Sequence, residues 1–315
     1  MLNRRYLRIK VMQALYAFFQ SENSDIAKGE QHLTHSINKI YDLYIYLMLL
    51  FTEIRDVAES TLNDAKNKRL PTKEDLDPNI KFITNPILQL LEKNLQLKKE
   101  AAARKIGWQE DPELIKKIYS AIKQHPIYQN YMLSEDTSFK AHSNFLYDIY
   151  AEVIGEFELL RYFFEEKNIH WADDIDYVNS MVVKTIEGFN EKSNENHPLL
   201  PLYKEAEDDR KFISDLFRKT IVNDKENAAY ISEKTKNWEV ERIAVMDVLL
   251  MKMAITELTQ FSQIPIKVTL NEYIELSKYY STPKSKIFIN GILDKLVADF
   301  KRTDKIQKTG RGLME

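Results

Sequence analysis

Residues 238–258 read WEVERIAVMDVLLMKMAITEL, and this stretch decides the fold class. It predicts a helix over about 239–260 that is apolar around most of its circumference. The apolar side chains are those of Ile243, Met246, Val248, Leu249, Leu250, Met253 and Leu258. A helix with apolar side chains on nearly every side has to be surrounded by other elements. We therefore predict that it forms the buried centre of a helical bundle.

Two helix starts are predicted in the segment that follows, residues 264–296, which reads IPIKVTLNEYIELSKYYSTPKSKIFINGILDKL. Thr269 and the glutamate three residues later fit a capping box, in which the threonine caps the helix. Thr282, followed by Pro283 at the first helical position, fits a second start, of a helix that runs to about residue 302. Gly291 lies inside this last helix, where we expect it to allow the close approach of another helix.

Helical periodicity continues through the rest of the chain. Further helices are predicted at about 4–20, 31–66, 86–106, 112–124, 137–168, 172–190, 204–223 and 225–236. The stretch 67–84 is predicted to be a loop and 190–201 a linker. The chain has only 7 glycines and 9 prolines, and it has no hairpin turns between alternating strands. We therefore predict an all-α fold, and 315 residues suggest either two domains or one domain with a large insertion.

The sequence lacks the residues on which several kinds of chemistry depend. It has no cysteine, which excludes a disulfide framework, a thiolate metal site and a thiol nucleophile. It has no phosphate-binding or dinucleotide-binding glycine loop and no nucleophile elbow. His32 with His35, and His170 with the aspartates after it, lack a matched set of metal ligands. We therefore expect no enzyme activity, no cofactor and no metal.

The hydrophobic segments are short. The longest apolar run, Leu43 to Phe51, falls far below the ~20 residues that a membrane-spanning helix needs. The basic start of the chain is followed by helically spaced apolar residues rather than by the unbroken apolar block of a signal peptide. We expect a soluble, cytoplasmic protein with no membrane partner.

Charge is distributed unevenly along the chain. Residues 1–20 hold four bases and no acid, and residues 276–315 hold nine bases and four acids, whereas the net charge is −3. The 255 residues between them therefore carry a net charge of −12. Basic ends could offer a local site to a polyanion, or the lysines could simply favour solubility. Arg4, Arg5 and Arg8 oppose the helix dipole at the start of the first helix, which favours a role in phosphate binding.

Three segments carry a family resemblance: RRYLRIKVMQALYAF at residues 4–18, and the two stretches at 238–258 and 264–296. Together they resemble the NusB family of transcription antitermination factors. The resemblance covers about 3–21 and 204–300, so the region between them is interpreted as a helical insertion. The expected organisation is as follows: 1–60 and 201–303 form a NusB-like helical bundle domain, 61–200 is the insertion, and 304–315 is a basic flexible tail.

The resemblance implies a non-enzymatic protein that binds RNA. Its partners would be boxA-type single-stranded nascent RNA, a small-subunit ribosomal protein called NusE, and the RNA polymerase antitermination complex, notably on ribosomal RNA operons. The RNA-binding residues that it implies are Arg4, Arg5, Arg8, Gln13, Tyr16, Lys284, Lys286, Phe288 and Asn290. The residues implied to contact the protein partner are Tyr16 and Asp247. The lysine pair departs from the family pattern, which can have an acid and a histidine there.

Other interpretations of these residues stay open. Phe288 could be a core residue, and Gln13 and Tyr16 could form a polar edge of the first helix. Asp247 has to lie at the rim of its apolar helix or be paired, because burying an unpaired carboxylate is costly. Lys252, five residues on, is a poor intrahelical partner, so we expect a basic group from outside that helix. A helical protein–protein scaffold without specific RNA binding is the alternative function.

Overall fold

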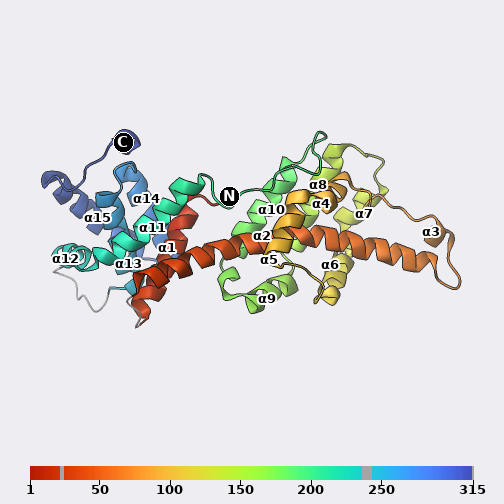
Figure 1. Ribbon diagram of the computed structural model, residues 1–315, viewed down its shortest axis with the longest axis horizontal. Coiled ribbons are helices and arrows are strands. Elements are labelled where there is room, and N and C mark those ends of the chain that lie inside the picture. Colours follow the sequence, from red (N-terminus) through yellow and green to blue (C-terminus); the bar gives the residue numbers. More distant parts are fainter. Residues whose placement is uncertain (22–24, 236–242, 314–315) are drawn as a thin grey trace. The chain divides into compact units, whose positions relative to one another are not determined.

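The computed structural model describes residues 1–21, 25–235 and 243–313, and their regular secondary structure is entirely helical (Figure 1). The predicted all-α class is confirmed. The longer helices are α1 (Arg4–Gln20), α2 (Ile26–Lys66), α6 (Pro112–Gln124), α8 (Phe139–Ile149), α10 (Ile175–Gly188), α11 (Ala206–Val222), α12 (Asp224–Lys234), α13 (Val245–Gln260), α14 (Ile266–Tyr280) and α15 (Ser285–Arg302). The shorter ones are α3 (Lys73–Leu76), α4 (Pro86–Lys93), α5 (Leu95–Arg104), α7 (Pro126–Leu133) and α9 (Glu158–Lys167). No described helix is both long enough and apolar enough to pass through a lipid bilayer.

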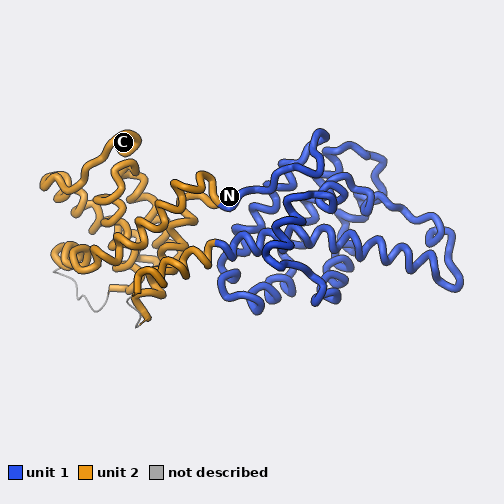
Figure 2. Tube along the Cα trace, in the orientation of Figure 1, with its two compact units in different colours: residues 1, 38–202 blue, residues 2–37, 203–315 orange. Residues whose placement is uncertain are grey.

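The chain forms two compact units (Figure 2). Unit 1 consists of residue 1 and residues 38–202, and unit 2 consists of residues 2–37 and 203–315. Helix α2 contributes to both, and its division between the units lies at residues 37 and 38, whereas the sequence pattern placed the end of the first NusB-like segment near residue 60. The buried stripe of α2 continues without interruption from Leu33 to Ile54. The spacing of its apolar residues therefore does not indicate where one unit ends and the other begins.

Unit 2 is built around α13, which packs against α1, α11, α12, α14 and α15 (Figure 1). Leu250, Met251, Met253, Ala254 and Ile255 of α13 are completely buried. The prediction that this helix forms the centre of a bundle is confirmed for its described part. The predicted start of the helix at 239–242 lies outside the described residues.

Three local predictions in unit 2 are wrong. Helix α14 begins at Ile266 with Pro265 as its N-cap residue, so Thr269 lies within the helix, where its side chain is buried. Helix α15 begins at Ser285 rather than at Pro283, because Ser285 accepts the backbone N–H of Thr282 in a turn that precedes the helix. Gly291 is exposed, and a Cβ atom there would meet nothing within 4 Å, so no helix approaches it.

Unit 1 surrounds the second part of α2, where Tyr44, Leu47 and Met48 are fully buried. Two helices predicted in this region are interrupted. The predicted helix at 86–106 breaks at Asn94, whose side chain accepts the N–H of Leu97 and thereby starts α5. The predicted helix at 137–168 breaks after a π-helical turn at Tyr150–Ile154.

Candidate nucleic-acid interface

A groove of about 1130 Å³ lies in unit 2, where the start of α1 meets α11 and the connection from α13 to α14. Its lining contains six basic and five acidic side chains, so it is rich in charge but nearly balanced. The bases are Arg4, Arg5, Arg8, Lys204, Lys211 and Arg311, and the acids are Glu205, Asp208, Asp209, Asp215 and Glu272. Which of these charges a ligand could reach depends on how they are paired.

Arg8 is paired inside the core. Its Nε and Nη2 atoms donate to the two carboxylate oxygens of Glu257 on α13, each at 2.8 Å, and the residue is only 2% exposed. Burial disfavours the charged guanidinium, but the ion pair and hydrogen bonds with Glu257 outweigh it, and the pKa of Arg8 lies above its ordinary value. In this conformation Arg8 therefore joins α1 to α13 and does not present its guanidinium to a phosphate.

Glu257 is the centre of a buried polar cluster that the sequence reasoning missed. Besides Arg8, it accepts hydrogen bonds from the hydroxyls of Thr269 at 2.8 Å and Tyr273 at 3.2 Å, both on α14. Burial raises the pKa of the Tyr273 hydroxyl well above its usual value, which keeps it a donor. The available signal was a single acid within the apolar run MAITEL, since a carboxylate there has to find a buried partner.

Arg4 and Arg5 are closer to solvent, with side chains 41% and 49% exposed. The Nε of Arg4 lies 2.9 Å from a carboxylate oxygen of Asp209 on α11, and Arg5 donates to both oxygens of Glu272 on α14, at 2.8 and 2.9 Å. The hydrogen bonds to Glu272 raise the pKa of Arg5. Each pair joins a half-exposed guanidinium to a less exposed carboxylate, so the outward-facing side of both arginines is open to solvent.

Asp209 is held rigidly by its own surroundings. It is buried, and its second oxygen accepts the backbone N–H groups of Lys204 and Glu205, at 3.0 and 3.1 Å. A single β-bridge between Leu2 and Tyr203 aligns the start of the chain with the start of this segment. The positions of Arg4 and of the Lys204 backbone are therefore fixed together.

The predicted residues of α15 are not among those that line the groove. Lys284 and Lys286 are exposed, Phe288 is half-buried, and the amide of Asn290 donates to Asp294 at 3.0 Å. Ser285, the first residue of α15, donates to Asp247 in the first turn of α13, whereas Arg8 donates to Glu257, ten residues further along α13. Ten residues of helix span about 15 Å, so the start of α15 and Arg8 contact opposite ends of α13.

Asp247 has a different environment from the one expected for a partner surface. It is 5% exposed, and its two oxygens accept the hydroxyls of Ser281 and Ser285, the latter at 2.8 Å. Its described partners are therefore these serines at the α14–α15 connection, rather than a basic group from outside the helix. Lys252 pairs with Asp224 of α12 at 2.6 Å, as its poor spacing from Asp247 suggested.

Gln13 and Tyr16 lie on the second half of α1. The side-chain oxygen of Gln13 accepts a hydrogen bond from the ammonium of the buried Lys10 at 3.1 Å, which is a contact within unit 2. Tyr16 is 43% exposed, and Phe19, one turn later, is also exposed. The Lys252 ammonium lies 5.3 Å from the centre of the Phe19 ring. An aromatic surface with a nearby cation is thus available at the end of α1.

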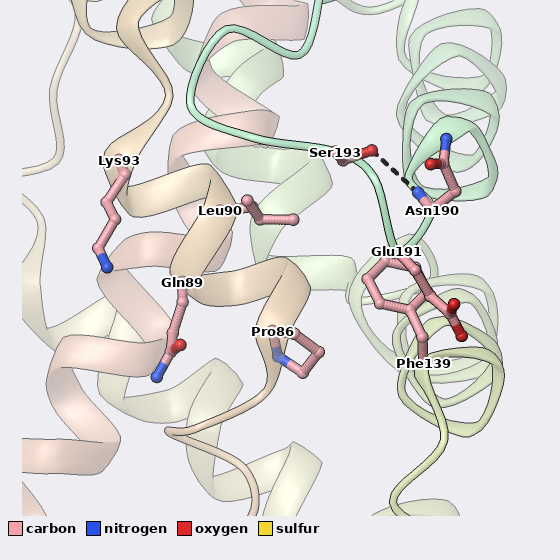
Figure 3. A pocket seen from close by; sticks show the side chains of 8 residues that line it. All are labelled: Pro86, Gln89, Leu90, Lys93, Phe139, Asn190, Glu191 and Ser193. Atoms are coloured by element: carbon pink, nitrogen blue, oxygen red, sulfur yellow. Dashed lines mark hydrogen bonds between the residues drawn. The ribbon is translucent and has the colours of Figure 1, made fainter.

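Unit 1 contains a smaller pocket of about 250 Å³ between α4, the start of α8 and the loop after α10 (Figure 3). The Ser193 hydroxyl accepts the backbone N–H of Asn190 there. Lys93 and Glu191 lie on opposite sides of the pocket, so no group of charges converges on a ligand. Within the described ranges, no three His, Asp or Glu side chains are arranged to hold a metal ion.

Comparison with known proteins identifies the family. Residues 176–298 match the NusB family. The chain is 43% identical over 105 residues to the transcription antitermination protein NusB of Salinibacter ruber, an alignment that covers 33% of this chain and 66% of that protein. The proteins of the same name from Chloroherpeton thalassium and Dictyoglomus turgidum are 39% and 41% identical over 104 and 85 residues, covering 33% and 27% of this chain.

These alignments cover between about half and two thirds of the curated relatives' own length, 49% and 57% for the last two. No solved structure matches the chain. The matched region begins in α10 of unit 1, contains α11 to α14 and ends within α15. Helices α11 to α15 build unit 2 together with the residues from 2 to 37. The C-terminal third of this chain, within residues 176–298, belongs to the NusB family.

Proposed function

We propose that this chain is an RNA-binding transcription antitermination factor. It acts on boxA-type nascent RNA of ribosomal RNA operons, as a heterodimer with the small-subunit ribosomal protein NusE, within an RNA polymerase antitermination complex. One observation carries the proposal: the family-matching helices close with α1 around a groove that holds accessible cations. The relatives named for transcription antitermination supply the process.

The charge of the two units favours unit 2 as the RNA-binding part. Unit 2 has 25 bases and 21 acids, a net charge of +4, and unit 1 has 20 bases and 27 acids, a net charge of −7. The excess acid of unit 1 is concentrated in residues 148–176, with nine acids and two bases. Polyanions are attracted locally by basic surface and repelled by acidic surface, so RNA should contact unit 2.

Within the groove, we assign the phosphate contacts to Arg4 and Arg5. Both are half-exposed, although Asp209 and Glu272, their carboxylate partners, are largely buried, and arginine's planar fork fits phosphate oxygens. Arg8 supports them from the core through its pair with Glu257. The assignment thus keeps the arginine-rich start as the RNA-binding element but divides its three members by role.

A second RNA contact is proposed at the start of α15, with Lys284, Lys286, Phe288 and Asn290. Ile287 and Tyr279 beside them are 72% and 80% exposed, and single-stranded RNA binds by stacking on exposed side chains as well as by phosphate contacts. Gln13 and Tyr16 complete the proposed set on α1. An exposed face that combines lysines with aromatic and apolar groups suits unpaired bases.

For the ribosomal partner, we propose the surface formed by Tyr16 and the neighbouring Phe19. Tyrosine and phenylalanine are enriched in protein interfaces, and both rings are exposed here. Asp247 contributes indirectly, since it holds the α14–α15 connection through Ser281 and Ser285.

The test is a gel-shift titration of the full chain with boxA-like RNA and with a scrambled RNA of equal length, each with and without the ribosomal protein. We expect tighter binding to the boxA-like RNA and a further gain with the ribosomal protein. Equal, weak binding of both RNAs under all conditions would favour the helical scaffold. The matched control is a variant with charge-neutralising changes in residues 148–176, which should not weaken RNA binding.

A further inference from the structure

Residues 305–313, which follow α15, form a defined segment that we call the strap. The chain reverses at the end of α15, where Asp304 adopts a left-handed conformation with φ of 55°. The Lys305 N–H donates to the Phe300 carbonyl at 2.9 Å and the Asp304 N–H to the Lys301 carbonyl at 3.4 Å, the hydrogen-bond pattern of a Schellman motif. This turn directs the following residues back along unit 2. The sequence had suggested a flexible tail here.

The strap is bound to the connection between α13 and α14. The Thr309 N–H donates to the Ser262 carbonyl at 3.0 Å, and the Thr309 hydroxyl accepts the Gln263 amide at 3.1 Å. The Lys308 ammonium donates to the carbonyl of Phe261 at 2.9 Å and lies 3.4 Å from that of Glu257. A cation there adds a second donor to these carbonyls, which already accept backbone N–H groups, and it complements the dipole at the end of α13.

Two of the chain's seven glycines occupy positions in the strap where a side chain would not fit. Gly310 has a φ of +54°, the left-handed region that glycine adopts at no steric cost. Gly312 is buried, and a Cβ atom there would lie 1.9 Å from the Ser262 carbonyl oxygen. The sequence TGRG at 309–312 is therefore matched to the bound conformation of the strap.

The residue between these glycines is Arg311, which lines the groove. The other three arginines of the groove are each paired with a carboxylate: Arg4 with Asp209, Arg5 with Glu272 and Arg8 with Glu257. Arg311 is exposed and has no ion pair or hydrogen bond from its side chain to any described residue. It is the groove arginine that can take an anion without first breaking a contact.

We propose that the strap is a permanent wall of the groove and that it presents Arg311 to a phosphate group of single-stranded RNA. This inference rests on the proposed function for the identity of the ligand, but the docking of the strap does not. The guanidinium offers several N–H donors in one plane and binds phosphate oxygens in pairs. Because both neighbours of Arg311 are held by backbone geometry, the position of its backbone is set before RNA arrives, so binding does not have to order the strap.

The experiment compares R311Q, G312A, the double variant and the wild-type full chain. K301Q, which removes an exposed cation of α15 outside the groove, is the matched control. Affinity for a boxA-like single-stranded RNA is measured by fluorescence polarisation over a series of salt concentrations. R311Q should weaken binding several-fold and lower the log–log salt slope by ~0.7, the value of one phosphate contact on a single strand.

G312A retains the arginine but should lose the same affinity, because the strap can no longer lie against Ser262. The double variant should lose no more than either single variant, since both changes remove one contact. K301Q should behave as wild type. A wild-type slope and affinity for R311Q would overturn the proposal, as would full affinity for G312A.

Two arms without RNA separate this inference from the proposed function. Hydrogen exchange of the Thr309 amide should be slow in wild type and R311Q and fast in G312A, and fast exchange in wild type would show that the strap is not docked. Inorganic phosphate should shift the Arg311 Nε–H resonance in the wild type and not in G312A. If the wild type binds no RNA, the proposed function fails, and the phosphate titration alone decides whether Arg311 is an anion site.

Discussion

Arg8 and Glu257 form a buried ion pair that fastens α1 to α13, with both hydrogen bonds at 2.8 Å. A pair of this kind is costly to desolvate and even costlier to break on one side, since the remaining charge stays buried without compensation. The two residues are 249 positions apart in the chain, so the pair also joins the two segments from which unit 2 is assembled.

The first prediction follows from this pair. Arg8→Ala should destabilise unit 2 by ~3–5 kcal/mol, because Glu257 is left buried and uncompensated. Chemical denaturation followed by circular dichroism measures the loss. Arg218→Ala, which removes a cation from an exposed pair with Glu30, should cost less than ~1 kcal/mol. Similar stabilities for the two variants would show that Arg8 is not the structural arginine.

The second prediction concerns Arg4 and Arg5. Replacing both by alanine should lower the log–log salt slope of RNA binding by ~1.4, which is ~0.7 for each phosphate contact. Some stability should be lost as well, because Asp209 is buried and loses its counter-charge. Arg218→Ala is again the control and should keep the wild-type slope. RNA titrations at several salt concentrations decide the question, and an unchanged slope in the double variant would place the RNA elsewhere.

The third prediction is a change of expectation for Asp247. The sequence suggested that a lysine there would leave the fold intact and weaken only the heterodimer. In the structure, Asp247→Lys would bury a cation beside Ser281 and Ser285 and remove the acceptor of both hydroxyls. We now expect a loss of stability of ~3 kcal/mol or more. Thermal unfolding checks this, and a fully stable Asp247→Lys protein would contradict the structural role.

The fourth prediction concerns Lys308. Burial lowers the pKa of its ammonium to about 8, from 10.5, although the Glu257 charge partly opposes the shift. A lowered pKa means that the docked strap binds this proton more weakly than the free strap does. Docking should therefore become more favourable as the pH rises from about 8 towards 10.5.

An NMR titration of the Lys308 side-chain carbon next to the amine measures that pKa directly. The midpoint should lie near 8 in the wild type and move towards 10.5 in Gly312→Ala, where the strap is released. Lys301, exposed on α15, serves as the internal reference in the same spectra. An ordinary midpoint for Lys308 in the wild type would argue against the buried contact.

The fifth prediction concerns the two units. Replacing residues 67–200 by a flexible linker leaves the second part of α2 without its covering helices, and exposes side chains such as Tyr44, Leu47 and Met48. We expect that variant to aggregate, whereas replacing residues 38–202 should give a soluble, cooperatively folding unit 2. Size-exclusion chromatography and thermal unfolding compare them. Aggregation of both would show that unit 2 depends on unit 1.

Helix positions were predictable wherever one segment contained its own signals. The predicted helix at 112–124 matches α6, since Pro112 is at its first position and an apolar stripe continues to Ile122. The burial of α13 followed from its composition alone. The break at Asn94 could not be predicted from the spacing of apolar residues. The asparagine side chain bonds to the backbone and ends one helix while it caps the next, and this does not alter the apolar pattern.

The candidate site was predictable as a cluster but not in the roles of its members. The three arginines lie within one and a half turns at one edge of α1, and the sequence does not show how deeply each is buried. Only the structure shows that Arg8 faces Glu257 while Arg5 faces solvent and Glu272. Arg311 was grouped with a flexible tail, because glycines next to a charged residue are typical of loops as well as of a tightly bound strap.

The shared helix α2 has a consequence for how the chain folds during synthesis. Unit 1 is continuous apart from its first residue, so it can fold as soon as it leaves the ribosome. Residues 2–37 have no such opportunity, because their packing partners begin at residue 203. Synthesis of the residues between takes roughly 10–30 s, during which Leu7, Val11 and Leu15 of α1 stay uncovered. A nascent-chain chaperone has a defined interval in which to bind this segment, and a long translational pause after residue 202 would lengthen it.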